Sequence, residues 1–332
     1  MEDLSEGLAE ERLLHSLGDF GIAPATTTYA PVGFGDYHWK VTGADGRRWF
    51  ATVADLEHKE HCGDGAVAAL TGLRRAMDTA VALREREGLR FVVAPLRATN
   101  GETVVPLDAR YALSVFPVVR GTPGHFGQKP TPQEHDQILD LLADLHSRTP
   151  PETTPMTVLD PAGRGGVDTA PREPVGEWRG GPFSEPARDL FAENVGLLHA
   201  RLEEFDQLAE EVRRRGAPRV VTHGEPHLGN LILGDDGYLL VDWDTVGLAV
   251  PERDLSVLSD SPLTLARYAE VTGRTPDAAA LALYRLRWSL VGVAEFITWF
   301  RGSHSRTSDT EAAWQGFTET LDHLLAPLKA EA

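Results

Sequence analysis

The sequence predicts an α+β protein with a β-rich N-terminal lobe and a mainly helical C-terminal lobe. Short apolar, β-branched runs separated by glycine and proline turns occupy most of the chain up to residue 118. After residue 130, most apolar residues recur at helical spacing. One β-rich stretch, 219–254, interrupts this helical part and carries polar side chains at its turns. We therefore expect two lobes, 1–118 and 119–332.

The composition is that of an acidic protein, with 332 residues and a formal charge of −18. Nucleic-acid-binding proteins need a basic surface, so this charge argues against that class. An acidic surface attracts cations, which fits a cationic small molecule, although general acidity explains the charge equally well. Cys62 is the single cysteine, no signal-peptide pattern is present, and the longest apolar stretch, 288–300, is interrupted by Glu295. We expect a cytoplasmic protein that binds neither nucleic acid nor membrane; monomer and homodimer both remain open.

The N-terminal lobe is predicted to hold a glycine loop, 31–36, between two strands. Gly33 and Gly35 let backbone N–H groups approach a phosphate, and Asp36 closes the loop, so all three are candidate nucleotide-binding residues. This spacing alone is a weak signal. The expected elements are a helix at 3–17, strands at 26–29, 37–41 and 48–53, a helix at 64–87 capped by Asp64, and strands at 90–93, 103–107 and 111–116.

The C-terminal lobe begins with a helix that Thr131 caps, because Glu134 three residues later completes a capping box. An irregular insertion, 148–186, is expected next. Further helices are predicted at 186–200, 201–215, 263–271, 275–301 and 309–328. Trp288 and Glu295 share a face of the 275–301 helix, where a carboxylate beside an aromatic ring could hold a cationic substrate. Packing is the commoner role of tryptophans at this spacing.

The stretch 219–254 is predicted to form three short strands, 220–222, 230–233 and 238–241, with a hairpin turn at 234–237. Asn230 and Asp242 both lie at the open end of this hairpin, so we expect them to be close together. The loop before the hairpin carries His223 and Glu225. An amide and two carboxylates therefore converge on one rim.

This rim has the chemistry of phosphoryl transfer. A metal ion that binds phosphates prefers hard oxygen ligands, which Asn230 and Asp242 supply. A hydroxyl nucleophile needs a carboxylate within hydrogen-bonding reach, and Glu225 is placed for that role. The order carboxylate, asparagine, aspartate is that of a kinase catalytic loop and magnesium loop. An acidic hairpin rim without function is the weaker alternative.

The same stretch resembles the aminoglycoside phosphotransferase / choline kinase-like family, and within it the spectinomycin- and viomycin-type branch. The matching segments are His-Gly-Glu-Pro-His-Leu-Gly-Asn at 223–230, Asp-Trp-Asp at 242–244 and Pro-Glu-Arg-Asp-Leu at 251–255. Glu225 stands where the family usually has aspartate. Because its side chain is one methylene longer, we expect the acceptor hydroxyl to lie slightly further back.

The resemblance implies a bilobal protein-kinase-like fold, with a nucleotide-binding N-lobe and a catalytic and substrate-binding C-lobe. It implies ATP or GTP with Mg²⁺ as cofactors, and a small-molecule substrate. Glu225 would accept or orient the hydroxyl proton, His223 would brace the loop, and Asn230 and Asp242 would hold magnesium. The remaining implied residues are Pro117 and Val119 in the hinge that holds adenine, and Asp244 and Glu252 near substrate amines.

The function expected from this resemblance is O-phosphorylation of a small hydroxylated molecule, most plainly an antibiotic of aminoglycoside or related type. One alternative is a metabolic kinase of an amino alcohol or sugar. A second alternative is a catalytically impaired binding protein, which the absence of an expected lysine motivates. The complete set Glu225, Asn230 and Asp242 argues against this second alternative.

The missing lysine concerns the third strand, where the family places a phosphate-binding lysine and this chain has Thr52. The following helix also has no glutamate in its first turns to pair with such a lysine. We expect a different cation to take its place. Arg74 and Arg75 are the candidates on that helix, with Arg75 assigned to the nucleotide site, and Lys59 is the fallback.

Overall fold

The computed structural model describes residues 1–3, 10–33, 35–168, 177–258 and 261–331. The chain forms two compact units. The first comprises 3–157 and 218–276 together with Met1, and the second comprises 158–217 and 277–332 together with Glu2. The first unit thus contains both the N-terminal sheet and the predicted catalytic hairpin. The functional division at residue 118 stays a prediction.

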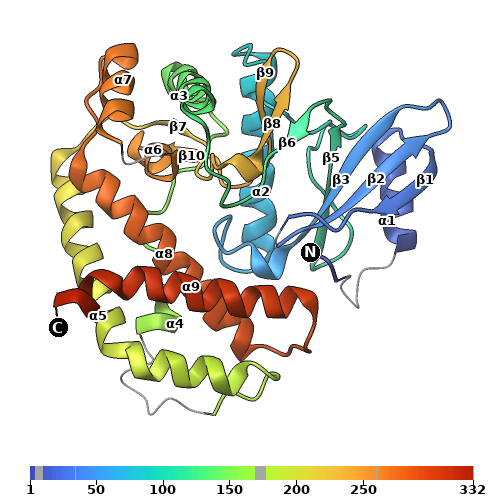
Figure 1. The fold of residues 1–332 in the computed structure, drawn as a ribbon. Helices are drawn as coiled ribbons and strands as arrows, with labels where there is room; N and C mark the ends of the chain where they lie inside the picture. Colours follow the sequence, from blue (N-terminus) through green and yellow to red (C-terminus); the bar gives the residue numbers. More distant parts are fainter. Residues whose placement is uncertain (4–9, 34, 169–176, 259–260, 332) are drawn as a thin grey trace. The chain divides into compact units, whose positions relative to one another are not determined.

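An antiparallel five-stranded sheet dominates the N-terminal part of the first unit (Figure 1). Its order is β1 (Pro24–Tyr29), β2 (Tyr37–Gly43), β3 (Arg48–Asp55), β5 (Tyr111–Pro117) and β4 (Val105–Pro106). Alternate residues of β2 and β3 pack with Leu13 and Leu17 of α1 (Glu10–Leu17), whereas Ala54 packs with Leu73 and Met77 of α2 (Ala66–Glu85). Helices therefore cover both faces, as strand alternation requires.

Most predicted N-terminal elements are confirmed, with two corrections. The strand expected at 90–93 was wrong, because Val92 forms only an isolated bridge to Leu240, at the end of the predicted hairpin. The cap of α2 is Gly65, with a φ of 78°, and not Asp64. Residues 4–9 of the first predicted helix and Phe34 of the glycine loop lie outside the described residues.

The remaining elements of the first unit are short strands, including the hairpin, and helices. Its elements are β6 (Thr122–Pro123), α3 (Pro132–Ser147), β7 (Val220–Thr222), β8 (Leu231–Gly234), β9 (Gly237–Leu240), β10 (Gly247–Ala249), α6 (Glu252–Leu258) and α7 (Pro262–Thr272). β8 and β9 form the predicted hairpin, β6 pairs with β8, and β7 pairs with β10. Both hydrogen bonds of the predicted capping box are present at Thr131.

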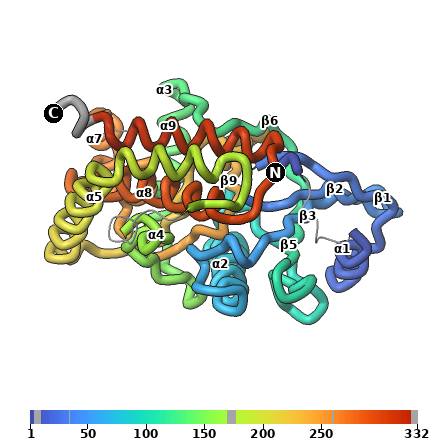
Figure 2. Tube along the Cα trace, turned by 90° about the horizontal axis from the view of Figure 1, so that it is seen from below, coloured from blue at the N-terminus to red at the C-terminus, as the bar shows by residue number. Residues whose placement is uncertain are grey.

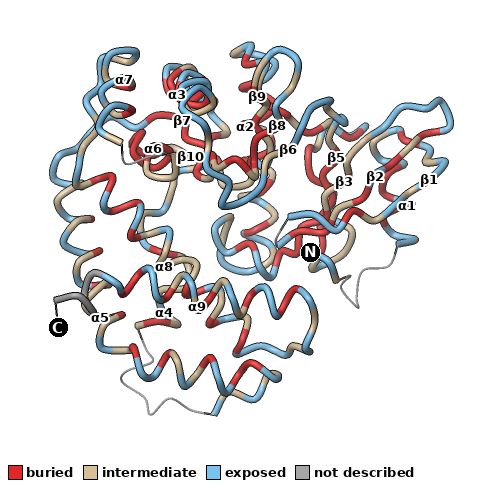
Figure 3. Tube along the Cα trace, viewed as in Figure 1, coloured by how far each residue is buried: buried red, intermediate tan, exposed pale blue. Residues whose placement is uncertain are grey.

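Trp243 anchors this part of the core. It is fully buried against Leu142, Leu145 and Val221, and its indole N–H donates to the Leu240 carbonyl at 2.9 Å. Burying a large apolar side chain contributes about 1.5–3 kcal/mol, which holds the hairpin end against α3. The two residues that flank Trp243 in the sequence, Asp242 and Asp244, are thereby fixed at the end of β9. Along β9, buried and intermediate positions alternate, as the colours of Figure 3 indicate.

The second unit is helical, with α4 (Arg164–Asp168), α5 (Ser184–Arg215), α8 (Ala278–Arg301) and α9 (Ser308–Glu331). Figure 2 shows α5, α8 and α9 side by side. The expected break at residue 200 was wrong: Phe191, Leu198, Leu202 and Phe205 form one continuous buried stripe, and the helix continues through Gly196 without interruption. Within the predicted insertion, 169–176 lies outside the described residues, and α4 lies just before it. Among the described residues, no helix meets the length and apolarity needed to cross a bilayer.

Candidate active site

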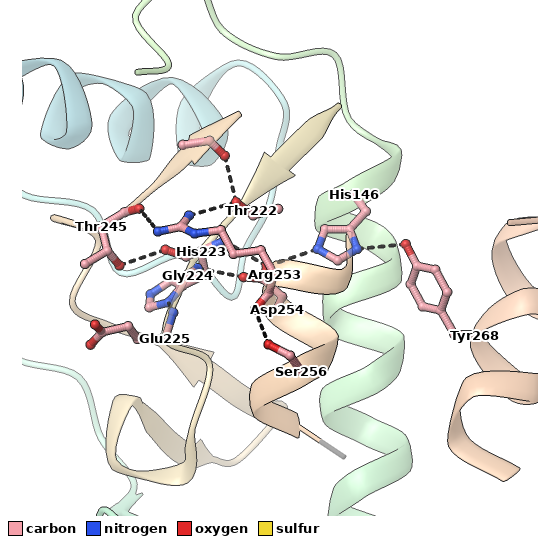
Figure 4. A network of polar contacts seen from close by, with 11 residues as sticks. His146, Thr222, His223, Gly224, Glu225, Thr245, Arg253, Asp254, Ser256 and Tyr268 are labelled. Atoms are coloured by element: carbon pink, nitrogen blue, oxygen red, sulfur yellow. Dashed lines mark hydrogen bonds and ion pairs between the residues drawn. The ribbon is translucent and has the colours of Figure 1, made fainter. Parts of the chain in front are cut away.

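The loop between β7 and β8, 223–230, is held by the buried carboxylate of Asp254. Asp254 accepts hydrogen bonds from the backbone N–H of His223 at 2.8 Å and of Gly224 at 2.6 Å (Figure 4). The His146 Nε2 lies 3.0 Å from the same carboxylate, and its Nδ1 lies 2.9 Å from the Tyr268 hydroxyl. Burial would raise the pKa of Asp254, but the hydrogen bond and charge of His146 bring it below its usual value. An ionised acceptor therefore fixes the backbone of the loop.

Arg253 provides a second support for the same loop. Its guanidinium donates to the Thr222 hydroxyl and to the Thr245 carbonyl, each at 2.8 Å. A Cβ at position 224 would come within 2.3 Å of the Arg253 Nη2, and Gly224 has a φ of 104°. Glycine is required at position 224 on both grounds.

His223 links this loop to the end of the hairpin. Its Nε2 lies 2.9 Å from the Val241 carbonyl, and its Nδ1 accepts a hydrogen bond from the Glu225 backbone N–H at 3.2 Å. These two contacts require the neutral tautomer with the proton on Nε2, and burial lowers the pKa of His223 accordingly. The geometry fits the predicted bracing role.

Glu225 projects away from the buried supports of the loop. Figure 4 shows its carboxylate directed away from Asp254. Partial burial and the charge of Asp244 raise the pKa of Glu225. A carboxylate with a raised pKa is a better proton acceptor than an ordinary one, which suits a group that must interact with a hydroxyl.

Asn230 and Asp242 meet at the open end of the hairpin, as predicted. The Asn230 carbonyl accepts from the Val241 N–H at 3.0 Å, and its side-chain nitrogen donates to the Glu225 carbonyl at 3.0 Å. That donation leaves the amide oxygen as the atom suited to a cation. Asp242 is exposed and has a φ of 64°, the single positive value among the described non-glycine residues. Such strain collects at functional sites, where the surrounding structure enforces it.

The donor set fits a magnesium ion that also binds phosphates. Among the described residues, no cluster of three or more histidine, cysteine or acidic side chains is arranged to hold a metal ion alone. Mg²⁺ commonly takes one or two protein carboxylates and completes its shell with phosphates and water. Asn230 and Asp242 would hold the ion in that way.

A buried cation lies beside this rim. Lys59 follows the short helix η2 (Leu56–His58), and its Nζ lies 2.6 Å from the Asp244 carboxylate and 3.0 Å from the Asp36 carboxylate. His61 Nε2 lies 3.1 Å from the same Asp244 oxygen. Burial opposes the charge of Lys59, but Asp244 and Asp36 raise its pKa, so the side chain is an ammonium.

Three predicted site residues need correction or relocation. Asp244 is occupied by Lys59 and His61, so it is not free for substrate amines. Glu252 is buried in the first turn of α6, so it is not an exposed group for substrate amines. Arg75 donates to the carbonyls of Thr153 and Thr154, so the structure does not bring it to the acidic rim.

The other predicted residues lie where the sequence placed them, but their roles stay predictions. Gly33 and Gly35 have φ values of 71° and 99° in the loop that precedes β2. Pro117 ends β5 and Val119 follows it. Thr52 lies on β3. Trp288 and Glu295 lie on α8, within the second unit.

Sequence reasoning missed several supports of the loop. Asp254 was given no role from the sequence beyond its place in a family segment, and His146 was given none. A histidine directly after the apolar stripe of α3 is the signal that could have suggested a buried partner. Tyr268 carried no such signal, because an isolated tyrosine on a short helix is common.

The sequence of the chain is similar to those of a protein family and of a known protein. The model of the family described as "Phosphotransferase enzyme family" matches residues 26–296. The chain belongs to this family. Protein StrN of Streptomyces griseus is 32% identical over 255 residues, covering 72% of this chain and 74% of StrN. This confirms the predicted family and the enzyme class, a small-molecule phosphotransferase that acts on an alcohol group.

Solved structures with low sequence identity share the fold. Spectinomycin phosphotransferase, in complex with ADP and spectinomycin, has a TM-score of 0.69 at 16% identity, with 95% of each chain covered. A microcompartment-associated aminopropanol kinase has a TM-score of 0.62 at 16% identity, covering 97% of this chain and 98% of its own. Choline kinase LicA from Streptococcus pneumoniae has a TM-score of 0.56 at 12% identity, covering 95% and 99%. The predicted kinase-like fold class is thereby confirmed.

Proposed function

We propose that this phosphotransferase transfers the γ-phosphoryl group of ATP, with Mg²⁺, to a hydroxyl group of an antibiotic of aminoglycoside or related type. One observation carries the proposal. Asp242 is held in a strained left-handed conformation beside Asn230, at the same rim as the projecting Glu225. Strain at an exposed carboxylate has a reason if that carboxylate binds a ligand.

In the proposed reaction, Glu225 orients the acceptor hydroxyl and takes its proton as the bond from oxygen to phosphorus forms. The bond between the γ-phosphorus and the bridging oxygen breaks, and ADP leaves. Magnesium, when bound by Asn230 and Asp242, supplies charge that neutralises the phosphates. His223 and Asp254 fix the loop, so Glu225 keeps its position while the phosphoryl group passes.

The proposed substrate class rests on the charge of the protein and on the fold that it shares with an antibiotic phosphotransferase. The charge of −18 favours a cationic acceptor, and a spectinomycin phosphotransferase shares the fold. Kinases of amino alcohols share that fold too, so a metabolic amino alcohol kinase is the second candidate. The buried ammonium of Lys59 beside the rim speaks against a catalytically impaired protein.

The test is an ADP-release assay on the purified protein with Mg²⁺ and either ATP or GTP. The acceptor panel contains aminoglycosides, spectinomycin and viomycin, with aminopropanol, ethanolamine and choline as the second class. We expect acceptor-dependent ADP release with one antibiotic, and a product whose mass has gained one phosphoryl group. Release with amino alcohols alone would transfer the assignment to the metabolic class. Absence of release with every acceptor would contradict the proposal.

A further inference from the structure

Position 52 of β3, where a phosphate-binding lysine was expected, carries a threonine and no cation. Thr52 Oγ1 lies 3.1 Å from the His38 Nδ1, and the His38 ring stacks on Phe50. Burial lowers the pKa of His38 to about 3, so that ring is neutral near pH 7. A neutral hydrogen-bonded pair therefore stands where related enzymes are expected to have a lysine.

Lys59 lies seven residues further along the chain and is held by a defined turn. Asp55, the last residue of β3, accepts a hydrogen bond from the Glu57 N–H at 3.2 Å and so caps η2. Arg110 binds the same carboxylate through two nitrogens, at 2.9 Å and 2.6 Å. The Lys59 carbonyl accepts from the Cys62 N–H at 2.8 Å. The backbone of Lys59 is thus fixed at both sides.

The ammonium of Lys59 connects two parts of the proposed nucleotide site. Asp36 closes the glycine loop, and Asp244 lies two residues beyond the proposed metal ligand Asp242. An ammonium carries three N–H donors, and these two carboxylates use two of them. The described residues provide no third hydrogen-bond partner for this ammonium, which leaves one donor for a phosphate oxygen. Lys59 is 7% exposed, so desolvation strengthens any such contact.

Asp36 gives an independent sign of a missing ligand. One of its oxygens, Oδ2, binds Lys59, whereas Oδ1 is buried and has no hydrogen-bond partner among the described residues. A buried polar atom without a partner requires an explanation, and this carboxylate oxygen, which is an acceptor, would be satisfied by a ligand that brings a hydrogen-bond donor or a metal ion and not by a phosphate oxygen.

The neighbouring cations are otherwise engaged. Arg253 binds Thr222 and Thr245, and Arg75 binds carbonyls at 153–154. Arg74 pairs with Glu102 at 3.0 Å. Among these side chains, Lys59 is the one that contacts both Asp36 of the glycine loop and Asp244, two residues beyond Asp242.

We propose that Lys59 contacts the nucleotide phosphates in place of a lysine on β3, and that Asp36 is the carboxylate that positions it. The inference rests on the proposed use of ATP. The ion pair expected between strand and helix is replaced by one between the segment after β3 and the glycine loop. The cation and its carboxylate partner are both at new positions, Lys59 and Asp36, so the positive charge of the site still has a negative partner.

The experiment compares the Lys59→Met variant with the wild type and with Lys40→Met, which removes an exposed lysine of β2 as the matched control. Titration calorimetry with Mg-ADP measures binding without any acceptor, and steady-state assays measure kcat/KM for ATP. We expect Lys59→Met to weaken nucleotide binding and to lower kcat/KM on the order of 10²-fold, with little change in the KM for the acceptor. Lys40→Met should match the wild type. Wild-type Mg-ADP affinity in Lys59→Met would overturn the proposal.

Asp36→Asn tests the positioning role. We expect a smaller rise in the KM for ATP, and little further loss when it is combined with Lys59→Met, because the two side chains act as a unit. Fully additive losses would overturn the assignment of Asp36. If Lys59→Met alone fails to fold, the variant that combines it with Asp36→Asn takes its place, because that variant no longer leaves the charge of Asp36 unpaired. Tight Mg-ADP binding by the combined variant would overturn the role of Lys59.

The outcomes separate this inference from the proposed function. If the wild type binds Mg-ADP, Lys59→Met does not, and no acceptor is phosphorylated, the proposed reaction fails and the role of Lys59 stands. If transfer occurs and Lys59→Met matches the wild type, the reaction stands and the role of Lys59 fails. A wild type that does not bind Mg-ADP contradicts both.

Discussion

The proposed catalytic hairpin and the proposed nucleotide-binding cation are built in different ways. The hairpin gathers Glu225, Asn230 and Asp242 from a single stretch, and one local turn brings the last two together. Lys59 meets Asp244, 185 positions away in the chain, and only the packing of the N-terminal sheet beside the hairpin brings them together. Local chemistry can thus be recognised as a motif, whereas a cation supplied from a distance can move along the chain without changing that motif.

The largest effect that separates the two regions should come from Asp242→Asn. Asparagine tolerates a positive φ, so the backbone should keep its shape while the anionic oxygen is lost. We expect turnover to fall on the order of 10³-fold, as for loss of a main electrostatic group. Asp235→Asn, at the exposed tip of the same hairpin, is the control and should be active. Normal turnover in Asp242→Asn would remove it from the metal site.

Asp254→Asn should next break the support of the hairpin loop. The carboxylate accepts from His223, Gly224 and His146, and an amide nitrogen would face one of these donors. We expect a loss of about 3 kcal/mol in the free energy of unfolding, as when a buried pair loses one partner. Urea denaturation at unchanged slope measures it. As the control, Asp140→Asn removes an exposed ion pair with Arg267 and should change the free energy of unfolding by less than about 1 kcal/mol. If the two variants lost equal amounts of unfolding free energy, Asp254 would not be a main support of the loop.

Glu225→Gln should distinguish acceptor chemistry from nucleotide binding. The group acts on the hydroxyl, so we expect turnover to fall on the order of 10²-fold while the affinity for Mg-ADP is retained. Lys59→Met should instead lose affinity for Mg-ADP, with little change in the KM for the acceptor. If Glu225→Gln loses Mg-ADP affinity as strongly as Lys59→Met does, the two regions do not have separate tasks. Turnover at the wild-type level would exclude Glu225 from the mechanism.

The contrast also explains what the sequence could predict. The hairpin, its turn and the meeting of Asn230 with Asp242 followed from strand patterns and a two-residue turn. The continuous helix α5 did not follow from the sequence pattern: a break was expected at residue 200, but the buried residues continue from Phe191 through Leu202 to Ala209. Arg75 was preferred to Lys59 because helical position was easier to infer than the path of the chain after β3. Contacts such as His146 with Asp254 join residues 108 positions apart, and no local pattern encodes them.

A smaller effect concerns the pH dependence of stability in the N-terminal sheet. Burial lowers the pKa of His38 to about 3, whereas the unfolded chain has a histidine pKa of about 6.5. Between these values the unfolded state binds more protons, so stability is present above pH 6.5 and is lost as the pH falls below it. The slope from this one group is at most about 1.4 kcal/mol per pH unit. His38→Asn should flatten the stability profile between pH 6 and 4, and an unchanged profile would contradict a neutral His38.

The smallest effect is expected for Thr52→Val, which tests whether the vacated position on β3 has any catalytic part. Valine keeps the shape and β-propensity of threonine but loses the hydroxyl that contacts His38 at 3.1 Å. One neutral hydrogen bond contributes about 1 kcal/mol, so the midpoint of urea denaturation should shift only slightly. The kcat/KM for ATP should stay at the wild-type value, because Lys59 and not Thr52 would contact the phosphates. A large rise in the KM for ATP, with stability unchanged, would show that the Thr52 hydroxyl itself binds nucleotide. Position 52 of β3 would then contribute to nucleotide binding in addition to Lys59.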